Sequence, residues 1–401
     1  MRVLILLEVD ITRSFDYGSG FRNNAGNNLF YTALAAAFVP RGGIVMTRAE
    51  VVRRVADDAD WVKRRFDVVV AAEACILCRY YADRMRELGE FYRHLGVPVY
   101  VFGVGVHAPL DAEPGFIREF GADASRFLDG VLSSGGQIAL RGEFSRAACA
   151  ELGFPDLFVS GCMALYLLGE SVPDFSVRCP PEEFVPAFNA ARADDIPDRL
   201  YAEFPKAVYF DQDVYGPLLR TPFRLPEKWA RGRRLIGLYR KSLSGRPSIR
   251  LHQDLPAWIS SFDESEISFS YGSRMHGNVL ALLAHRPCYV RVPDMRVREL
   301  VEFYRIPSSV SVPFDERKDS LYHLYRSLDW SGFLMNYRQI KCRIDGFLDT
   351  IAPRDPGAKD LPFPPFPVVE SVGMEFRYST LLRLQLARLG DALFGRRRGG
   401  K

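Results

Sequence analysis

Continuous apolar runs alternate with longer amphipathic segments over residues 1–168. The runs indicate buried strands, because both faces of each run are apolar, and the segments between them have helical spacing. The predicted strands are 3–7, 66–72, 97–103, 137–140 and 157–159, and the predicted helices are 27–38, 81–95, 125–132 and 143–152. Buried strands that alternate with helices predict a parallel sheet covered on both faces.

A second alternating unit follows a segment rich in proline and acidic residues, 169–206, which we interpret as a linker. The predicted strands of this unit are 235–239, 267–271 and 288–292, and its predicted helices are 255–262, 275–284, 296–304, 321–328 and 336–351. The chain is therefore expected to be an α/β protein with a GT-B-like architecture. Two doubly wound, Rossmann-like domains, 1–168 and 207–352, would bind ligands in a cleft at the carboxyl ends of their strands.

The remaining segment, 353–401, begins with a proline-rich stretch and ends in a predicted basic amphipathic helix. Leucines at 382, 386, 389 and 393 form its apolar stripe, and three arginines, 396–398, follow it. Such a helix either docks on a domain or lies on an anionic membrane surface. The second alternative would make the protein peripheral at the inner face of the cell membrane.

Composition narrows the classes of function. The chain has 401 residues and a net charge of +4, so it lacks the basic excess of a nucleic-acid-binding protein. No apolar run is long enough to span a membrane, and Glu8 and Asp10 follow the short apolar start, which argues against a signal peptide. Seven cysteines without periodic spacing indicate reduced thiols and a cytoplasmic location. Cys75 and Cys78 have no second pair to complete a zinc site, so no metal is expected.

The most informative segment connects the predicted strand 267–271 to the helix 275–284. It reads Gly272-Ser273-Arg274-Met275-His276-Gly277. The start of a helix offers free N–H groups and positive potential, and glycine permits close approach to a ligand. An arginine fork matches phosphate or carboxylate oxygens, and histidine can also deliver a proton. We expect Arg274 and His276 to contact an anion, although an ion pair and a helix cap would also explain them.

Further polar residues follow other predicted strands. Arg141 directly follows the strand 137–140 and would face Arg274 across the cleft. Arg296 lies in a first helical turn, where a cation opposes the helix dipole, and Asp294 is expected to cap that helix. The turn before the first helix could bind sugar hydroxyls or phosphate, or could simply cap that helix, and a histidine shortly after the strand 97–103 could reach the cleft. The candidates for these contacts are Asn24, Gly26, Asn27 and His107.

Taken in order, these segments resemble the polysaccharide pyruvyl transferase family over residues 1–310. The matching segments are Asn24-Ala25-Gly26-Asn27, Arg141, Gly161-Cys162, 272–277 and Asp294-Met295-Arg296. The resemblance implies a GT-B-like fold and transfer of the enolpyruvyl carbons of phosphoenolpyruvate onto a sugar as a ketal, with no metal or cofactor. It also implies that Arg141, Arg274 and His276 bind the donor. We expect His276 to act as general acid or to orient phosphate. Arg141, Arg274 and Arg296 would stabilise the charge of the leaving phosphate.

The chain departs from the family pattern at several positions. Asn27 and Gly142 stand where the family usually has aspartates, Cys162-Met163 replaces Asp-Pro, and Arg296 replaces a common lysine. These changes affect the acceptor side more than the donor side. The acceptor sugar, lipid-linked or nucleotide-linked, belongs to a cell-surface polysaccharide or its precursor. Two alternatives stay open: a GT-B glycosyltransferase that uses a nucleotide-sugar, and a non-catalytic member that binds a glycan or acts as a scaffold.

Overall fold

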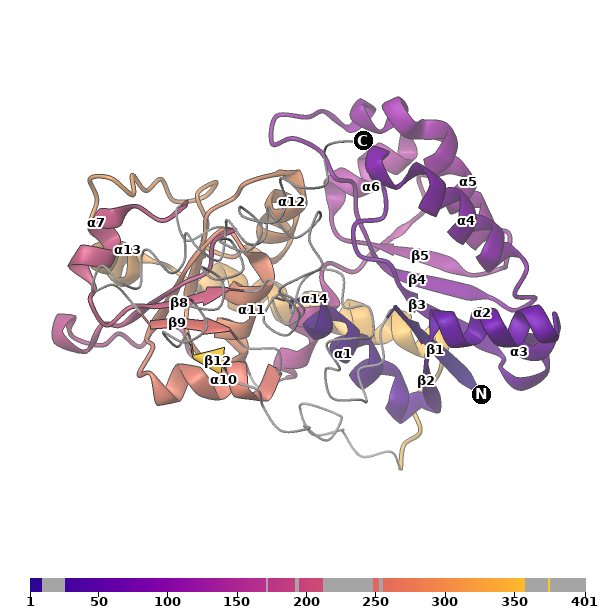
Figure 1. Cartoon of the computed structure of the whole chain (residues 1–401), viewed down its shortest axis with the longest axis horizontal. Coiled ribbons are helices and arrows are strands. Elements are labelled where there is room, and N and C mark those ends of the chain that lie inside the picture. The colour runs from indigo at the N-terminus through magenta and orange to yellow at the C-terminus, as the bar shows by residue number, and fades with distance from the viewer. Residues whose placement is uncertain are drawn as a thin grey trace, which may run out of the picture.

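A computed structural model describes residues 1–8, 26–170, 172–191, 195–211, 248–251, 255–357 and 374–375. Two α/β domains lie side by side, the first in indigo to purple and the second in rose to orange (Figure 1). Each is built on a sheet that is parallel throughout or nearly so, as the alternation of strands and helices predicts. This is the expected α/β, GT-B-like class. None of the described helices combines the length and apolar composition needed to cross a membrane.

The first sheet has the order β2-β1-β3-β4-β5-β6 and is parallel throughout. Its strands are β1 (Val3–Leu7), β2 (Gly43–Thr47), β3 (Val68–Ala72), β4 (Val99–Val104), β5 (Gln137–Leu140) and β6 (Phe158–Val159). Its helices are α1 (Gly26–Phe38), α2 (Arg48–Asp57), α3 (Trp61–Arg65), α4 (Ala82–Arg93), α5 (Gly121–Leu132) and α6 (Glu143–Ala150). Alternate residues of β1 pack into two different cores, one with α1 and one with α4 and α5.

The second sheet has the order β11-β10-β7-β8-β9-β12, and only β12 runs antiparallel. Its strands are β7 (Pro186–Phe188), β8 (Val208–Asp211), β9 (Ser248–Leu251), β10 (Phe269–Gly272), β11 (Cys288–Val290) and β12 (Met374–Glu375). Its helices are α7 (Asp198–Glu203), α10 (Leu255–Glu264), α11 (Met275–Leu283), α12 (Met295–Tyr304), α13 (Leu321–Ser327) and α14 (Ser331–Ile351). Short 3-10 helices are η1 (Val39–Arg41), η2 (Arg79–Tyr81), η3 (Pro114–Phe120), η4 (Met163–Leu168) and η5 (Pro181–Glu183).

The segment 169–206 is more than the linker that the sequence predicts. It contributes β7, which pairs with β10 and β8 in the middle of the second sheet. This strand has three residues and begins with a proline, so it lacks the length and the β-branched composition that mark a strand in a sequence. The predicted strand 235–239 and the predicted helix through 382–393 lie outside the described residues.

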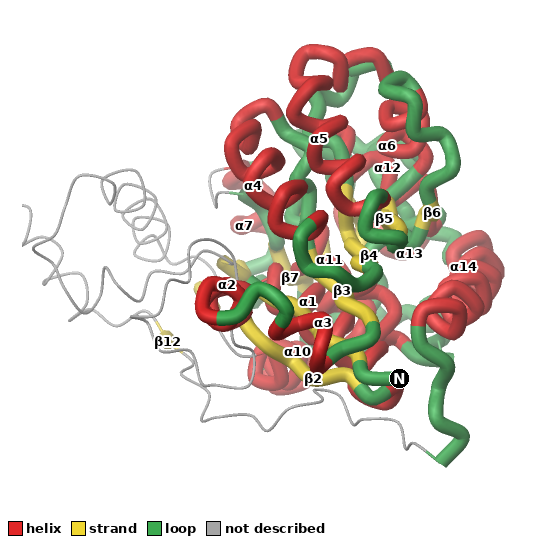
Figure 2. The backbone as a smooth tube through the Cα atoms, turned by 90° about the vertical axis from the view of Figure 1, so that its right-hand side faces the viewer, coloured by secondary structure: helices red, strands yellow, loops and turns green. Residues whose placement is uncertain are grey.

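Helix α14, expected to close the second domain, contacts α12 there and also packs on the first sheet. The Phe347 ring stacks on Phe158 with centroids 4.0 Å apart and contacts Phe102 at 5.9 Å. An Arg343 guanidinium N–H donates to the Val159 carbonyl at 2.8 Å. Figure 2 shows this long helix at the right-hand edge of the molecule. The chain thus returns to the first domain after completing most of the second, which ties the two domains together.

Candidate active site

The turn that carries Arg274 lies where the second sheet changes direction. Successive strands run outward from β7 on one side and from β10 on the other, so β7 and β10 border the topological switch point. In open parallel sheets, ligands bind at the carboxyl ends of strands at such a point. Gly272 ends β10 with φ of +152°, and the Arg274 N–H donates to the Asn189 carbonyl after β7 at 2.9 Å.

Buried side chains stabilise this turn through hydrogen bonds. The Asn278 amide donates to the carbonyls of Gly272 and Arg274 at 3.0 and 3.1 Å. The Ser270 hydroxyl donates to the Asn278 side-chain oxygen at 2.8 Å and accepts from the Asn189 amide at 2.7 Å. The backbone around Arg274 is therefore fixed without the arginine side chain. The sequence analysis missed Asn278, whose only signal is a polar residue inside an apolar helix.

Replacing Gly272 by Ala should lower the free energy of unfolding by roughly 3 kcal/mol or more, because its φ is unfavourable for other residues and its added Cβ would lie 2.0 Å from the Asn189 oxygen. Urea denaturation measures this change. Gly346→Ala on α14 is the control: its Cβ meets no atom within 4 Å, and alanine should stabilise the helix slightly. Equal stability of Gly272→Ala and the wild type would contradict this account.

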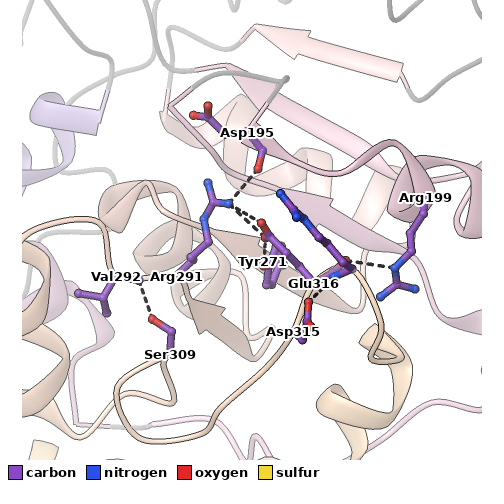
Figure 3. Close-up of polar contacts among 9 residues, drawn as sticks. Asp195, Arg199, Tyr271, Arg291, Val292, Ser309, Asp315 and Glu316 are labelled. Atoms are coloured by element: carbon purple, nitrogen blue, oxygen red, sulfur yellow. Dashed lines mark hydrogen bonds and ion pairs between the residues drawn. The ribbon is translucent and has the colours of Figure 1, made fainter.

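Next to the turn, a polar cluster joins the ends of β10 and β11 (Figure 3). Arg291 follows β11 and donates to both carboxylate oxygens of Glu316, at 3.0 and 3.1 Å, and to the Asp195 carbonyl at 2.8 Å. The Tyr271 hydroxyl donates to the same carboxylate at 2.6 Å, and the Arg291 backbone N–H donates to Gly272 at 3.0 Å. Since its charge is paired, Arg291 supports the site rather than offering itself to an anion.

His276, the second residue of α11, meets the first domain. Its Nε2 lies 3.9 Å from the Sγ of Cys162, which follows β6. Burial, with the charges of Arg141 and Arg274, lowers the pKa of His276 to about 3. The imidazole is therefore neutral at pH 7 in the free protein. Two arginines from different domains act on this one ring, so the structure brings Arg141, Arg274 and His276 together.

Arg141 lies at the end of β5 and is 7% exposed. Its Nε–H donates to the Gly103 carbonyl at 3.2 Å, and its backbone N–H donates to Val104 at 2.9 Å. A Cβ on Gly103 would lie 2.4 Å from the Phe30 ring, so α1 also packs against this strand end. No described residue accepts a hydrogen bond from the two terminal guanidinium nitrogens of Arg141. A buried arginine with unused donors is suited to bind an anion.

Arg296 is the third arginine of this group, and its charge acts on Arg141. Asp294 caps α12 as expected: one oxygen accepts the Val297 N–H at 3.1 Å, and the other pairs with Arg296 at 2.6 Å. Burial and the charge of Arg296 lower the pKa of His107, which places His107 on the Arg296 side of the group. With Asp294 paired to Arg296, the terminal nitrogens of Arg141, which have no acceptor among the described residues, can bind a ligand.

The acceptor-side candidates are only partly described. Asn24 lies outside the described residues, whereas Gly26 and Asn27 are the first two residues of α1. The next residue, Asn28, is 3% exposed, and neither its amide nitrogen nor its oxygen has a hydrogen-bond partner among the described residues. A buried amide without a partner is costly, so it indicates a ligand contact that the sequence analysis did not single out. Its only sequence signal is the run of asparagines before it.

Over the described ranges, no group of three or more His, Cys, Asp or Glu side chains could hold a metal ion. Cys75 and Cys78 are buried free thiols, and the Cys78 sulfur lies 3.6 Å from Nδ1 of His107.

The fold and site define a two-domain α/β protein with arginines and a histidine gathered at strand ends from both sheets. The sequence model of the polysaccharide pyruvyl transferase family matches residues 77–294, more than half of the 401 residues. The chain belongs to this family. Comparison with curated proteins gives no significant match.

Several solved structures are distantly similar. The S. aureus MnaA–UDP co-structure has 13% identity and a TM-score of 0.44, covering 87% of this chain and 96% of the other. An uncharacterised protein from Klebsiella pneumoniae has 10% identity and a TM-score of 0.37, covering 76% and 90%. The glycosyltransferase SnogD from Streptomyces nogalater has 14% identity and a TM-score of 0.30, covering 96% and 99%.

Proposed function

We propose that this protein transfers the enolpyruvyl carbons of phosphoenolpyruvate onto two hydroxyls of a sugar, forming a pyruvate ketal. Membership of the polysaccharide pyruvyl transferase family supports a transferase that acts on a polysaccharide or its precursor. The observation that carries the donor assignment is the meeting of Arg141 and Arg274 at His276. Two positive charges from different domains act there on one buried imidazole.

The donor suits this charge distribution. Phosphoenolpyruvate carries a phosphate and a carboxylate on a three-carbon frame, so several cations must converge on a small volume. Arg141 offers two terminal nitrogens from which no described residue accepts a hydrogen bond. Arg274 is the N-cap of α11, where the helix N-terminus adds positive potential. Arg296, paired with Asp294, lies close enough for its charge to act on Arg141. A dianion bound among these arginines would offset their positive charge, which is costly to bury without a partner.

In this proposal His276 gains its proton when the donor binds. Burial and the charges of Arg141 and Arg274 hold the pKa of His276 at about 3, and a bound phosphate and carboxylate oppose the effect of the two arginines. The imidazolium then gives its proton to the methylene carbon, and C2 gains oxocarbenium character. One sugar hydroxyl adds to C2, phosphate departs, and the second hydroxyl adds in its place. Of the two hydroxyl protons, one restores His276 and the other leaves with phosphate.

We place the acceptor beside the start of α1. The unpartnered Asn28 amide, with Gly26 and Asn27 before it, offers hydrogen bonds that sugar hydroxyls can satisfy. We assign His107, on which the charge of Arg296 acts, to the same acceptor side. This chemistry asks for no metal or cofactor, because phosphoenolpyruvate is itself the co-substrate. A lipid-linked acceptor would bring the protein to the inner face of the cell membrane, where the basic segment 353–401 could bind anionic lipid.

The test is incubation of the full chain with phosphoenolpyruvate and a panel of lipid-linked and nucleotide-linked sugars. We expect release of inorganic phosphate together with acceptor whose mass has increased by a pyruvyl ketal. Calorimetry should show binding of phosphoenolpyruvate and none of uridine or guanosine diphosphate. Binding of a nucleotide instead of phosphoenolpyruvate would favour the glycosyltransferase alternative. Sugar binding with neither donor would favour a non-catalytic protein.

A further inference from the structure

A carboxylate of the second domain is buried inside the first, close to Arg141. Glu299 lies on α12 and is 3% exposed. Both of its oxygens accept hydrogen bonds from Ser145 of α6: the backbone N–H donates to Oε2 and the hydroxyl to Oε1, each at 3.0 Å. Two hydrogen bonds from one residue to a buried carboxylate make this a directed contact between the domains.

Helix α6 begins without a cap from its own segment. Its N-cap is Gly142, which has no side chain, and its φ of −171° is extended backbone that any residue adopts. A Cβ at this position would lie 2.8 Å from Cβ and 2.9 Å from Oε2 of Glu299. Glycine therefore leaves room for Glu299. The carboxylate satisfies a free N–H in the first turn of α6, where the helix dipole favours a negative charge.

The turn capped in this way is the one that carries Arg141, which directly precedes Gly142. A Cβ on Gly105 would lie 3.0 Å from Cδ of Arg141 and 3.2 Å from Oε1 of Glu299, so the arginine stem and the carboxylate flank the same glycine. The Ser145 hydroxyl also accepts the Val106 N–H at 3.0 Å. One hydroxyl thus links α12 to α6 and to the loop after β4.

Other residues of α12 contact the first domain at both ends of the helix. The Met295 N–H donates to the Ala108 carbonyl at 3.3 Å. The Tyr304 hydroxyl donates to the Ser160 carbonyl at 3.2 Å. The bond to Ser145 lies between these two contacts and is the one that involves a charge.

We propose that Glu299 is a positioning residue of the donor site, a helix cap supplied across the domain interface that holds Arg141 facing Arg274 and His276. The substrate in this inference rests on the proposed function, whereas the cap rests on geometry alone. Docking of α12 on α6 then completes the donor site, because the same carboxylate that joins the domains fixes the turn with the binding arginine.

The charge of Glu299 changes near neutral pH. Burial raises the pKa of Glu299 to about 7, and the Ser145 hydrogen bonds and the charge of Arg141 oppose that rise. Protonation removes the negative charge of the carboxylate and turns one of its two acceptor oxygens into a donor, so the cap strengthens as pH rises through about 7. The other titratable groups that interact with Glu299 are Asp294 at the start of α12, Cys75 after β3 and Cys149 on α6.

Glu299→Gln tests this role, with Glu302→Gln as the matched control on the same helix. Glu302 has a side chain 49% exposed and pairs only with Arg298 among the described residues. The ratio of wild-type to Glu299→Gln kcat/KM for phosphoenolpyruvate should rise from near one at about pH 5.5 to roughly tenfold at about pH 8.5, mainly through KM. Taking the ratio cancels the ionisation of the donor. A ratio independent of pH, or the same ratio for Glu302→Gln, would overturn the proposal.

Gly142→Ala perturbs the same contact from the first domain. Its methyl group would displace Glu299, so KM for phosphoenolpyruvate should again rise about tenfold. Adding Glu299→Gln to Gly142→Ala should raise KM little further, because both substitutions remove the same contact. If the effects of the two substitutions on log KM were fully additive, they would not act on one shared contact.

Hydrogen exchange separates this inference from the proposed function. Exchange of the Ser145 amide should be roughly tenfold faster in Glu299→Gln than in the wild type at about pH 8, and unchanged in Glu302→Gln. If the wild type shows no turnover of phosphoenolpyruvate, the proposed function fails. The exchange rate of the Ser145 amide still shows whether Glu299 caps α6. Equal Ser145 exchange in the wild type and Glu299→Gln would overturn the cap whatever the activity.

Discussion

Replacing Arg141 by lysine should lower kcat/KM for phosphoenolpyruvate by roughly 10³-fold, because a lysine keeps the charge and loses the planar fork. The terminal nitrogens of Arg141 have no described acceptor, so their hydrogen bonds are available to the donor. Lysine also lacks the Nε–H that fixes the side chain on the Gly103 carbonyl. Steady-state kinetics of phosphate release measure the loss.

Arg146→Lys is the control for this variant. Arg146 lies on the same helix that follows Arg141, but its side chain is 51% exposed and pairs with Glu143. Kinetics close to wild type are expected for it, since an exposed ion pair contributes little. If Arg141→Lys bound phosphoenolpyruvate in a calorimeter as tightly as the wild type does, Arg141 would not be a donor ligand.

Much of this fold follows from apolar periodicity. Strands such as β1 and β3 are continuous apolar runs within a few residues of where the sequence places them, because a strand covered on both faces needs apolar residues at every position. The apolar pattern does not predict strands β8 and β9, and β9 has the mixed composition Ser-Ile-Arg-Leu. The packing of α14 on the first sheet could not be predicted from its own sequence. An apolar stripe predicts that one face of a helix is buried, but it does not indicate which sheet that face packs on.

The arginine and histidine candidates were predictable because strand-to-helix turns are local in sequence. Glu299 and Asn28 were not, since their significance depends on long-range neighbours: Glu299 lies 154 positions from its Ser145 partner. Polar residues inside amphipathic helices usually face solvent, and the sequence carries no mark of their burial. Gly142 illustrates the same limit. Its departure from the family pattern is explained only by the structure, in which Glu299 occupies the space that a side chain at position 142 would need.

His276→Ala should lower turnover by ~10²-fold or more while leaving the protein folded, because the variant loses the proposed proton donor and creates no charge imbalance. His94→Ala is the control, since the His94 side chain is 73% exposed on the far end of α4. Both variants should keep the wild-type circular dichroism. Turnover of His276→Ala equal to that of the wild type would exclude the catalytic role.

The protonation of His276 gives a second test of the same assignment. Since burial and two arginines lower the pKa of His276 to about 3, its imidazole NMR signals should not titrate between about pH 5 and pH 8 in the free protein. With phosphoenolpyruvate bound, the donor's negative charge should raise this pKa, so that the ring titrates within that range and kcat falls as pH rises through it. The signal is assigned by its absence in His276→Ala. A free-protein pKa near 6.5 would mean that the arginines do not act on His276, and an unchanged pKa with the donor bound would exclude it as the acid that protonates the methylene carbon.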